Sequence, residues 1–367
     1  MIVLQSTQAE ILKVMQAVAS TPDTKQHSIL TNAKIEKDGN LLSVTGANSE
    51  MAMTVTSYLG GEAGSFEATV PVRKLVAVLQ SLPSNEAVTL ESKDGTLILW
   101  SQSTNVLMNT LPAATFSAIQ FAGTPTAVFK LPQLVLRELI EQVAFAMPSA
   151  DTREYLNGAC LRISQKTATL VATDKRKIAM AVVDIEASQH PAEVILPRRS
   201  VLELQRWFGS GSAMVEVHLT DRLAKFSTGG MQIVTKLLSG KFPDFSSLWS
   251  AGPITKVDVP RDALLSSLRR AIVMAKENFT AVHVVLTKNM LTLTGVQSEF
   301  GISFDEINVR YTGIDVETSF DAKYLFDAVS NIESHKVILA LGPKQAHMHM
   351  TKPGTNRFLY VAAQLRI

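Results

Sequence analysis

Few side chains in this sequence stand where they could do chemistry together. His347 and His349 alternate along a strand-like segment, so they share a face and could hold a metal ion. A metal site needs a third ligand, and no Cys, Asp or Glu stands at a supporting spacing. The single cysteine, Cys160, lies in the apolar run Ala159-Cys160-Leu161. That setting is typical of a packed thiol, so the sequence predicts neither a metal site nor a thiol catalyst.

The phosphate-binding and acyl-transfer motifs of enzymes are likewise incomplete. Gly240-Lys241 lacks the upstream glycine of a phosphate loop, and Phe242 replaces its hydroxyl residue. The chain has no Gly-x-Ser-x-Gly elbow, and Gly209-Ser210-Gly211-Ser212 is typical of a loop between a helix and a strand. Lys175-Arg176-Lys177 could grip phosphate, but it follows a strand-like run and favours a turn. We therefore expect a non-catalytic protein that needs no cofactor or metal.

The composition indicates a folded protein of two or three domains. The chain has 367 residues, of which 46% are hydrophobic and 19% are charged, enough to bury sizeable cores. Its formal net charge of +2 is too weak for a protein that holds nucleic acid by electrostatics alone. One cysteine allows no internal disulfide, which fits a reducing compartment. Met1–Gln5 does not resemble a signal peptide and the apolar runs are too short to span a membrane, so we expect a cytoplasmic protein.

The sequence repeats itself weakly three times. Thr45-Gly46-Ala47-Asn48-Ser49-Glu50-Met51 returns as Thr294-Gly295-Val296-Gln297-Ser298-Glu299-Phe300, 249 residues later. A middle copy, Val171-Ala172-Thr173-Asp174-Lys175-Arg176-Lys177-Ile178, stands about halfway between them. Helix starts repeat in the same register, with offsets of 126 and 250 residues between Val70–Leu75, Leu196–Val201 and Phe320–Leu325.

Each repeat has the pattern of an α+β domain. Residues 8–20, 132–147 and 260–275 have the apolar spacing of amphipathic helices and open the three repeats. Alternating runs such as 214–219 indicate strands between the helices. Each repeat is therefore expected to hold two helices packed on antiparallel sheet. Gly and Pro residues near 123–125 and 251–253 place the domains at 1–122, 123–252 and 253–367.

Several stretches, in this order and spacing, resemble one known family across the whole chain. They are Thr110-Leu111-Pro112-Ala113-Ala114, Asp151-Thr152-Arg153-Glu154-Tyr155-Leu156-Asn157-Gly158, Val171-Ala172-Thr173-Asp174 and Gly240-Lys241-Phe242-Pro243-Asp244. Together with the threefold repeat, they resemble the bacterial DNA sliding clamp, the beta subunit of DNA polymerase III. The resemblance implies a DNA replication protein that acts as a processivity factor and is not itself an enzyme.

The resemblance also implies a homodimer. Two chains of three domains would form a closed six-domain ring, joined head to tail, with helices lining the hole and sheets forming the outer wall. The joint would use Lys74 and Val106 from the first domain and Val273, Met274 and Glu299 from the third. Lys74 and Glu299 would form an ion pair across it. A ring holds duplex DNA topologically, so its contacts can be weak and independent of base sequence.

By resemblance, the residues that would face DNA come from helix starts and loops. Arg73 and Arg198 occupy equivalent helix starts, and Arg153 and Tyr155 lie in the loop before Leu156. Lys25 is a shifted substitute for a basic residue that the family often places in the loop after the first helix. Glu154 stands where family members can carry an aromatic residue, and a carboxylate beside phosphate weakens the grip of this loop.

A second implied site is an apolar cleft that takes short peptides from polymerases, the clamp loader and repair proteins. Its apolar walls would supply binding energy and its few polar groups would orient the peptide. The chain departs from a family ending that is richer in Met and Pro, because Ala363 and Gln364 widen one wall and make it more polar. The matching residues are Leu156, Thr173, Lys175, Arg176, Ile178, Pro243, Leu248, Val361, Ala363 and Leu365.

The sequence also allows other hypotheses about function. An accessory or drug-resistant clamp of the same fold would differ in its peptide preference, and the basic charge balance favours this reading because sliding clamps are commonly acidic. A DNA-processing or nucleotide-processing enzyme would show metal-dependent turnover, against which the missing carboxylate clusters argue. A monomeric DNA-binding protein would hold linear and circular DNA equally well, with a steep dependence on salt.

Overall fold

A computed structural model describes most of the chain. It covers residues 2–23, 29–59, 65–102, 104–186, 188, 190–209, 211–245, 255–276, 279–296, 298–341 and 347–365. These residues form two compact units, described here separately. Unit 1 comprises residues 1–133, 188–190 and 209–237, and unit 2 comprises residues 134–187, 191–208 and 238–367.

The first third of the chain repeats one element order twice. A strand, a helix and three further strands form the first half, and the same order forms the second. The first half is β1 (Ile2–Thr7), α1 (Gln8–Val18), β2 (Ala33–Asp38), β3 (Leu41–Ala47) and β4 (Met51–Tyr58). The second is β5 (Ser65–Val70), α2 (Val72–Gln80), β6 (Ala87–Lys93), β7 (Thr96–Ser101) and β8 (Thr104–Asn109).

The other two thirds follow the same order. The middle halves are β9 (Ala127–Pro132), α3 (Gln133–Ala144), β10 (Gly158–Ile163), β11 (Thr167–Thr173) and β12 (Lys177–Asp184), then β13 (Ala192–Pro197), α4 (Arg198–Trp207), β14 (Met214–Leu219), β15 (Leu223–Thr228) and β16 (Met231–Lys236). The last halves are β17 (Thr255–Pro260), α6 (Arg261–Met274), β18 (Ala281–Thr287), β19 (Met290–Gly295) and β20 (Phe304–Asn308), then β21 (Val316–Asp321), α7 (Ala322–Ser330), β22 (Lys336–Leu341), β23 (His347–Thr351) and β24 (Phe358–Ala363).

Each unit contains one eight-stranded and one four-stranded antiparallel sheet. In unit 1 the orders are β5-β2-β3-β4-β16-β15-β14-β9 and β1-β6-β7-β8. In unit 2 they are β13-β10-β11-β12-β24-β23-β22-β17 and β20-β19-β18-β21. The first strand of each half pairs with the other half of its domain, as β1 does with β6 and β5 with β2. This exchange ties the two halves of a domain together.

The helices begin where local chemistry allows. Thr7 and Glu10 form a capping box at the start of α1, so they satisfy backbone N–H groups that have no partner within the helix. Pro71, Pro197 and Pro260 precede α2, α4 and α6. The predicted helices at 8–20, 132–147 and 260–275 are confirmed as α1, α3 and α6, each shorter than predicted by a few terminal residues.

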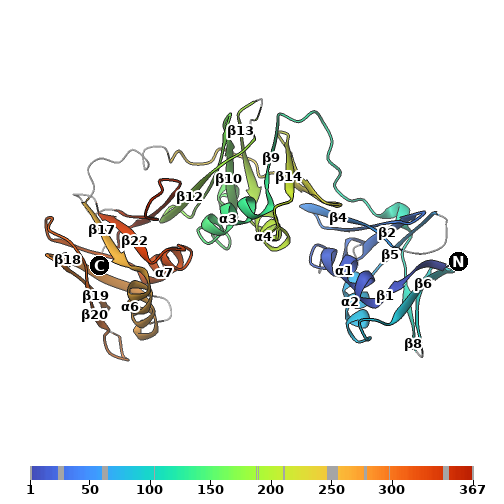
Figure 1. Cartoon of the computed structure of the whole chain (residues 1–367), viewed down its shortest axis with the longest axis horizontal. Helices are drawn as coiled ribbons and strands as arrows, with labels where there is room; N and C mark the ends of the chain where they lie inside the picture. The colour runs from blue at the N-terminus through green and yellow to red at the C-terminus, as the bar shows by residue number, and fades with distance from the viewer. Residues whose placement is uncertain are drawn as a thin grey trace. The chain divides into compact units, whose positions relative to one another are not determined.

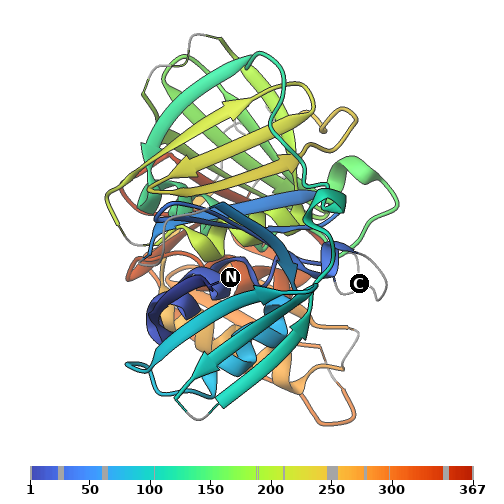
Figure 2. The same cartoon turned by 90° about the vertical axis from the view of Figure 1, so that its right-hand side faces the viewer.

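The helices bury their apolar faces against the sheets. Figures 1 and 2 show the helices lying against the sheets. α1 and α2 contact each other, as do α6 and α7, while α4 packs on β10 and α7 packs on β24. Ile11, Met15, Leu75 and Leu325 are almost completely buried at these contacts. Each such side chain contributes roughly 1.5–3 kcal/mol through burial. No helix in the described ranges is long and apolar enough to span a membrane.

Candidate functional site

An apolar row crosses one face of the eight-stranded sheet of unit 2. The strand register places Ile195, Cys160, Val171, Met180 and Leu359 side by side, one from each of five neighbouring strands. Residues directly opposite one another in antiparallel strands point to the same face, so these side chains form one surface. We call it the cleft face. The opposite face packs on α7, where the Tyr360 hydroxyl donates to the carbonyl of Tyr324 at 2.9 Å.

Segment 238–245 lies across the cleft face. It carries Phe242 and Phe245, which are 4% and 5% exposed and pack edge to face with ring centroids 6.3 Å apart. Leu238 anchors its start, because its N–H donates to the carbonyl of Ile195 at 2.9 Å. Gly240 has φ +112°, a conformation that favours glycine, and its backbone packs close to Tyr155. Both aromatic side chains join the apolar row in one cluster.

Of the predicted cleft residues, Val361 belongs to this cluster and Ile178 packs against it. Ile178 lies directly opposite Val361 where β12 pairs with β24, so β24 borders the apolar row. Val361 is 2% exposed, whereas Ile178 and Pro243 are half-buried and offer surface to a ligand. Leu156 and Thr173 are buried, Ala363 and Leu365 are half-buried, and Leu248 lies outside the described residues.

The turn between β11 and β12, which lies just before Ile178 in the chain, carries two basic side chains. Thr173 Oγ1 donates to the carbonyl of Lys177 at 2.7 Å and accepts the N–H of Lys175 at 2.9 Å. Asp174 accepts the N–H groups of both Arg176 and Lys177 at 2.8 Å. This turn leaves the side chains of Lys175 and Arg176 exposed. Lys177 is buried instead, with its ammonium 4.4 Å from the centre of the Tyr324 ring.

The buried cysteine lies in this cluster and not in a reactive setting. Cys160 is fully buried, and that burial raises the pKa of its thiol to about 12. The sequence prediction of a packed thiol is therefore confirmed. Sequence reasoning missed Phe242 as a cluster member and did not consider Phe245. The spacing of the two rings, three residues apart in an irregular segment after a strand, was the available signal.

The predicted DNA-facing residues differ in their surroundings. Arg153 forms a bidentate ion pair with Asp151, with N–O distances of 2.8 and 2.7 Å, and its hydrogen bonds hold the pKa of that carboxyl well below its usual range. Tyr155 packs against the apolar cluster. Arg73 is exposed but donates to the carbonyls of Ala19 and Pro22 at 3.1 and 2.8 Å.

Arg198 and Lys25 complete that set. The backbone N–H of Arg198 donates to the carbonyl of Asn157 at 2.9 Å, which fixes the start of α4 beside the loop before β10. Its Nε is buried without a hydrogen-bond partner among the described residues. Lys25 lies outside the described residues. Sequence reasoning did not single out Arg206 and Arg269, which are exposed on α4 and α6.

The residues predicted for a dimer joint come from α2 and β8 in unit 1 and from α6 and the loop after β19 in unit 2. Lys74 is exposed at the start of α2, and Val106 is half-buried on β8. Val273 is 71% exposed near the end of α6, and Met274 beside it is half-buried. Glu299 is exposed, 3.8 Å from the ammonium of Lys276 in the same chain. Sequence reasoning missed the exposed apolar residues around them, which are Leu107, Phe300, Ile302 and Phe304.

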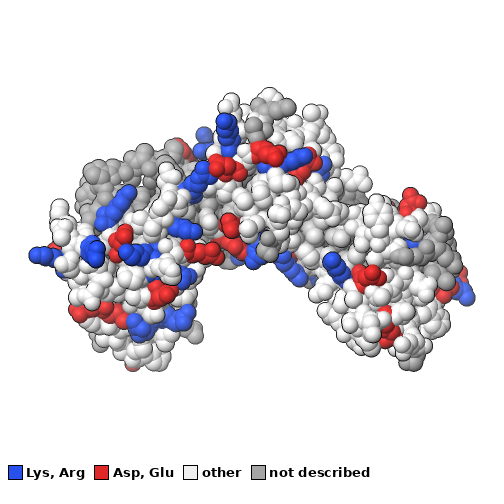
Figure 3. Space-filling model, in the orientation of Figure 1, with Lys and Arg blue, Asp and Glu red and all other residues white. Residues whose placement is uncertain are grey.

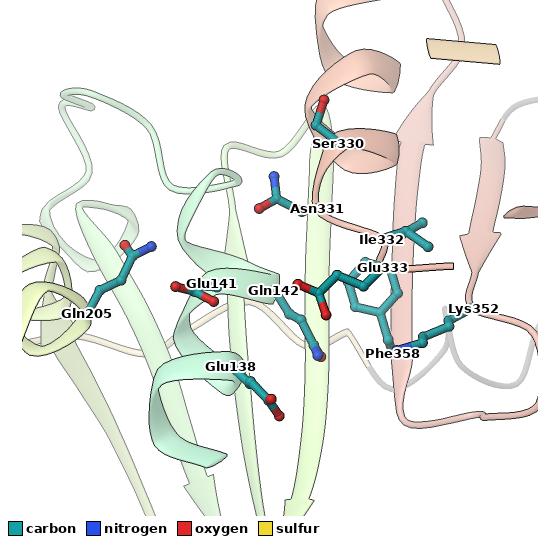
Figure 4. A pocket seen from close by; sticks show the side chains of 10 residues that line it. All are labelled: Glu138, Glu141, Gln142, Gln205, Ser330, Asn331, Ile332, Glu333, Lys352 and Phe358. Atoms are coloured by element: carbon teal, nitrogen blue, oxygen red, sulfur yellow. The ribbon is translucent and has the colours of Figure 1, made fainter. Parts of the chain in front are cut away.

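Unit 2 also has a polar cavity of about 310 Å³ among its helices (Figure 4). Glu138 and Glu141 of α3 face it together with Glu333, which follows α7. Glu141 is engaged by Arg137 at 2.7 Å. No group of three His, Cys, Asp or Glu residues that could hold a metal ion occurs among the described residues. On the face drawn in Figure 3, acidic and basic side chains are interspersed on both units.

Comparisons with known proteins identify the class to which this arrangement belongs. Three sequence models describe the domains of the DNA polymerase III beta subunit, and all three match this chain. The model of the N-terminal domain matches residues 4–120, that of the central domain 130–244 and that of the C-terminal domain 251–366. Three such domains in one chain define a DNA polymerase sliding clamp. The chain therefore belongs to the family of bacterial DNA polymerase III beta subunits.

Individual relatives agree along the whole length. The beta sliding clamp of Pseudomonas putida is 29% identical over 359 residues, which cover 97% of this chain and 98% of that protein. The clamp of Escherichia coli K12 is 26% identical over 339 residues, 92% of each chain. The crystal structure of the Pseudomonas aeruginosa clamp with ligand covers 100% of both chains, with a TM-score of 0.95 and 27% identity. Another P. aeruginosa clamp, bound to griselimycin, has a TM-score of 0.95 and 28% identity.

These findings confirm the predicted fold of three repeated clamp domains and the prediction of a non-catalytic replication protein. The domain boundaries at residues 122 and 252 stay a prediction, and the second lies outside the described residues. The central repeat contributes β9 and β14–β16 to unit 1 and β10–β13 to unit 2.

Proposed function

We propose that this chain is a processivity factor that acts in the bacterial cytoplasm as a head-to-tail homodimeric ring. The ring encircles duplex DNA, slides along it, and tethers the polymerase, the clamp loader and repair proteins through the cleft face of unit 2. It needs no cofactor and does no chemistry on DNA. The three domains of each chain supply half of a six-domain ring.

The observation that best supports this ring is that two strands, β8 and β20, lie at the edges of their sheets without a further partner among the described strands. Each half of a domain ends in a last strand, and the six last strands are β4, β8, β12, β16, β20 and β24. β4 pairs with β16, and β12 pairs with β24, in each case extending two four-stranded sheets into one of eight. β8 and β20 remain at the ends of their own sheets. A second copy would pair β8 of one chain with β20 of the other, twice, and close the ring.

The surfaces beside these two strands favour that closure. Leu107 on β8 is 64% exposed, and Phe304 on β20 is 63% exposed. Phe300 and Ile302 add apolar surface beside β20. An exposed strand edge flanked by large apolar side chains promotes uncontrolled association unless another chain covers it. Val106, Val273 and Met274 would be buried in the same joint, and Lys74 would approach Glu299.

A ring explains the modest charge of the chain. A protein that holds DNA by phosphate contacts gains affinity with every neutralised phosphate, and it then binds too tightly to slide. A net charge of +2 and basic side chains engaged by Asp151 or by backbone carbonyls suit weak contacts. Arg73, Arg153, Arg198 and Lys25 are the proposed phosphate contacts, with Tyr155 beside them.

The cleft face suits a short peptide with apolar side chains. Ile178 and Pro243 are half-buried beside the buried cluster, so a ligand could cover apolar surface there without unfolding the sheet. Lys175, Arg176 and Thr173 would orient the peptide from the turn, and Leu365 would extend the wall formed by Val361. A specialised clamp with altered peptide preference is the second candidate, because Ala363 and Gln364 form the last part of that wall.

Light scattering on a sizing column, followed by retention on DNA, tests the ring. A species of twice 39.9 kDa that stays on circular DNA and slips from linear DNA is the expected result. Phe304→Asp on β20 should give monomers that are lost from both DNAs. Ile314→Asp, at a residue 84% exposed in the loop before β21, is the matched control and should remain dimeric. A wild-type monomer at every concentration would contradict the proposal.

A further inference from the structure

The two histidines that formed an incomplete metal site in the sequence belong to the cleft face. In the register of β23 and β24, His349 lies directly opposite Val361, and His347 lies directly opposite Ala363. Side chains at directly opposed positions share a face and have Cβ atoms about 4.5–5.5 Å apart. Val361 belongs to the apolar cluster of that face. Both imidazoles therefore stand beside β24, the strand that borders the apolar row.

The alternation of β23 supports this placement. Met348 and Met350 are buried at 1% and 0% exposure and point to the opposite face, toward the helices. His349 is 8% exposed, whereas His347 is exposed. Burial, with the nearby charge of His347 as a smaller cause, lowers the pKa of His349. Within the described part of the chain, neither imidazole makes a hydrogen bond or an ion pair.

The described residues directly opposite the two histidines carry no charge that would neutralise an incoming anion. Val361 and Ala363 on β24 and Ala340 on β22 are uncharged and flank the two histidines. The carbonyl of Arg176 accepts the N–H of Ala363 at 2.8 Å. In that turn the side chains of Lys175 and Arg176 outnumber the carboxylate of Asp174, so the turn adds positive charge. An imidazole always carries at least one N–H donor, and a carboxylate is the acceptor that gains most from it.

We propose that His347 and His349 are specificity-determining residues of the cleft, which donate N–H groups to a carboxylate of the bound peptide. The apolar cluster holds the side chains of the peptide, and the histidines select an acidic residue beside them. This inference rests on the proposed peptide-binding function of the same face. A metal site does not explain the pair, because the described residues supply no third ligand.

A set of peptide pairs tests the preference. Fluorescein-labelled hexapeptides with one Leu-Phe pair carry Asp or Asn at each of the four remaining positions in turn, and fluorescence anisotropy gives the affinity of each for the full-length clamp. At one position, Asp should bind about fivefold or more tightly than Asn, the size of one partly exposed charge-assisted hydrogen bond. In a His347→Leu/His349→Leu variant, this ratio should fall below about twofold while Asn peptides bind as before.

Two further variants separate a hydrogen bond from packing. His349→Gln keeps an amide N–H and should recover part of the preference that His349→Leu loses. His335→Leu removes an exposed histidine that directly precedes β22, at the end of that strand away from Ala340. It should leave the preference for Asp over Asn unchanged. If the His349 variants do not fold, His347→Leu alone tests the proposal, because His347 is exposed and its replacement should not disturb the core.

The outcomes distinguish the two proposals. An equal affinity for Asp and Asn at all positions, or a preference that survives removal of both histidines, would overturn the role of the histidines but leave the cleft standing. Failure of every peptide, with Asp and Asn alike, would overturn the cleft and the histidine role together.

Discussion

The two eight-stranded sheets share one topology but present different chemistry. In unit 2 the row across the sheet is Cys160, Val171, Met180 and Leu359. In unit 1 the same register gives Lys34, Thr45, Thr54 and Gln232. Cys160 pairs with Val171 as Lys34 pairs with Thr45, so the positions correspond strand by strand. The backbone repeats, while the side chains separate an apolar surface from a polar one.

The segments that cross the two sheets differ in the same way. In unit 1, Phe116, Ile119 and Phe121 border a cavity of about 480 Å³ whose floor includes Lys34, Thr45 and Thr54. The charge of Lys34 in this floor is paired within the sheet, because its ammonium lies 2.8 Å from Glu36 and 3.0 Å from Glu67. In unit 2, Phe242 and Phe245 are buried in contact with the sheet. An apolar peptide gains binding energy where it covers apolar surface, so the comparison favours unit 2 as the place of the proposed cleft.

Thiol reactivity should show the largest difference. Burial holds the pKa of Cys160 near 12, so its thiolate is about a thousandfold scarcer at neutral pH than that of an ordinary cysteine. In a Cys160→Ser background, Lys34→Cys places a thiol at the corresponding position of the polar sheet. It should react with iodoacetamide at least about a thousandfold faster than native Cys160. Equal rates at pH 8 would show that the two floors are equally accessible.

The crossing segments should differ next most in stability. Phe245→Ala removes a ring that is 5% exposed and should cost about 3–5 kcal/mol, because it leaves a cavity over the apolar row. Phe121 is half-buried, with its ring edge-on to His218 at a centroid distance of 5.9 Å. Phe121→Ala should cost only about 1 kcal/mol, since it loses partial burial, one aromatic contact and the ammonium of Lys225 at 5.1 Å from the ring centre.

Hydrogen exchange locates these losses in the chain. Phe245→Ala should speed exchange in β10–β12 and β24, and Phe121→Ala should leave β2–β4 and β16 nearly unchanged. A large loss of protection in unit 1 would contradict the difference drawn between the two segments.

The sequence predicted the threefold repeat but not its division into halves. Gly46–Glu50 returns in altered form as Gly295–Glu299, and Val70–Arg73 as Leu196–Arg199, because turns and helix starts depend on particular residue types. The exchange of β1 and β5 between the halves depends instead on strand pairing, which any alternating run can satisfy. The sequence therefore predicts the residues that begin the helices, but it does not predict the order of the strands in the sheets.

The site was predicted in part for a similar reason. Ile178 and Val361 were named by resemblance, and the structure places them opposite each other. Phe245 belongs to an irregular segment, and no periodicity indicates which way such a ring points. The engagement of Arg153 by Asp151 depends on a loop folding back by two residues, which the one-letter pattern leaves open.

Matched valines should separate binding from stability. Val361 and Val234 occupy corresponding positions on β24 and β16, and each is 2% exposed. Val361→Ala and Val234→Ala should each cost a similar free energy of unfolding, on the order of 1–2 kcal/mol. Only Val361→Ala should weaken binding of a Leu-Phe peptide, by roughly tenfold, because only Val361 belongs to the proposed peptide-binding face. Equal losses of affinity, measured by anisotropy, would place the peptide elsewhere or make the effect indirect.

The smallest effect should come from the polar floor itself. Thr45 and Thr54 share a hydrogen bond of 2.9 Å, and their counterparts in unit 2 are Val171 and Met180. Thr45→Val or Thr54→Val alone leaves one hydroxyl without its partner and should cost about 1 kcal/mol. The double variant removes both hydroxyls and should cost less than the sum of the single changes, with a coupling of about 0.5–1 kcal/mol in urea denaturation. Strictly additive costs would mean that the two hydroxyls do not depend on each other. The polar floor would then differ from the apolar row only in how its side chains are solvated. A coupled pair would mean instead that the two hydroxyls satisfy each other, so that the repeated backbone carries a polar surface in unit 1 and an apolar one in unit 2.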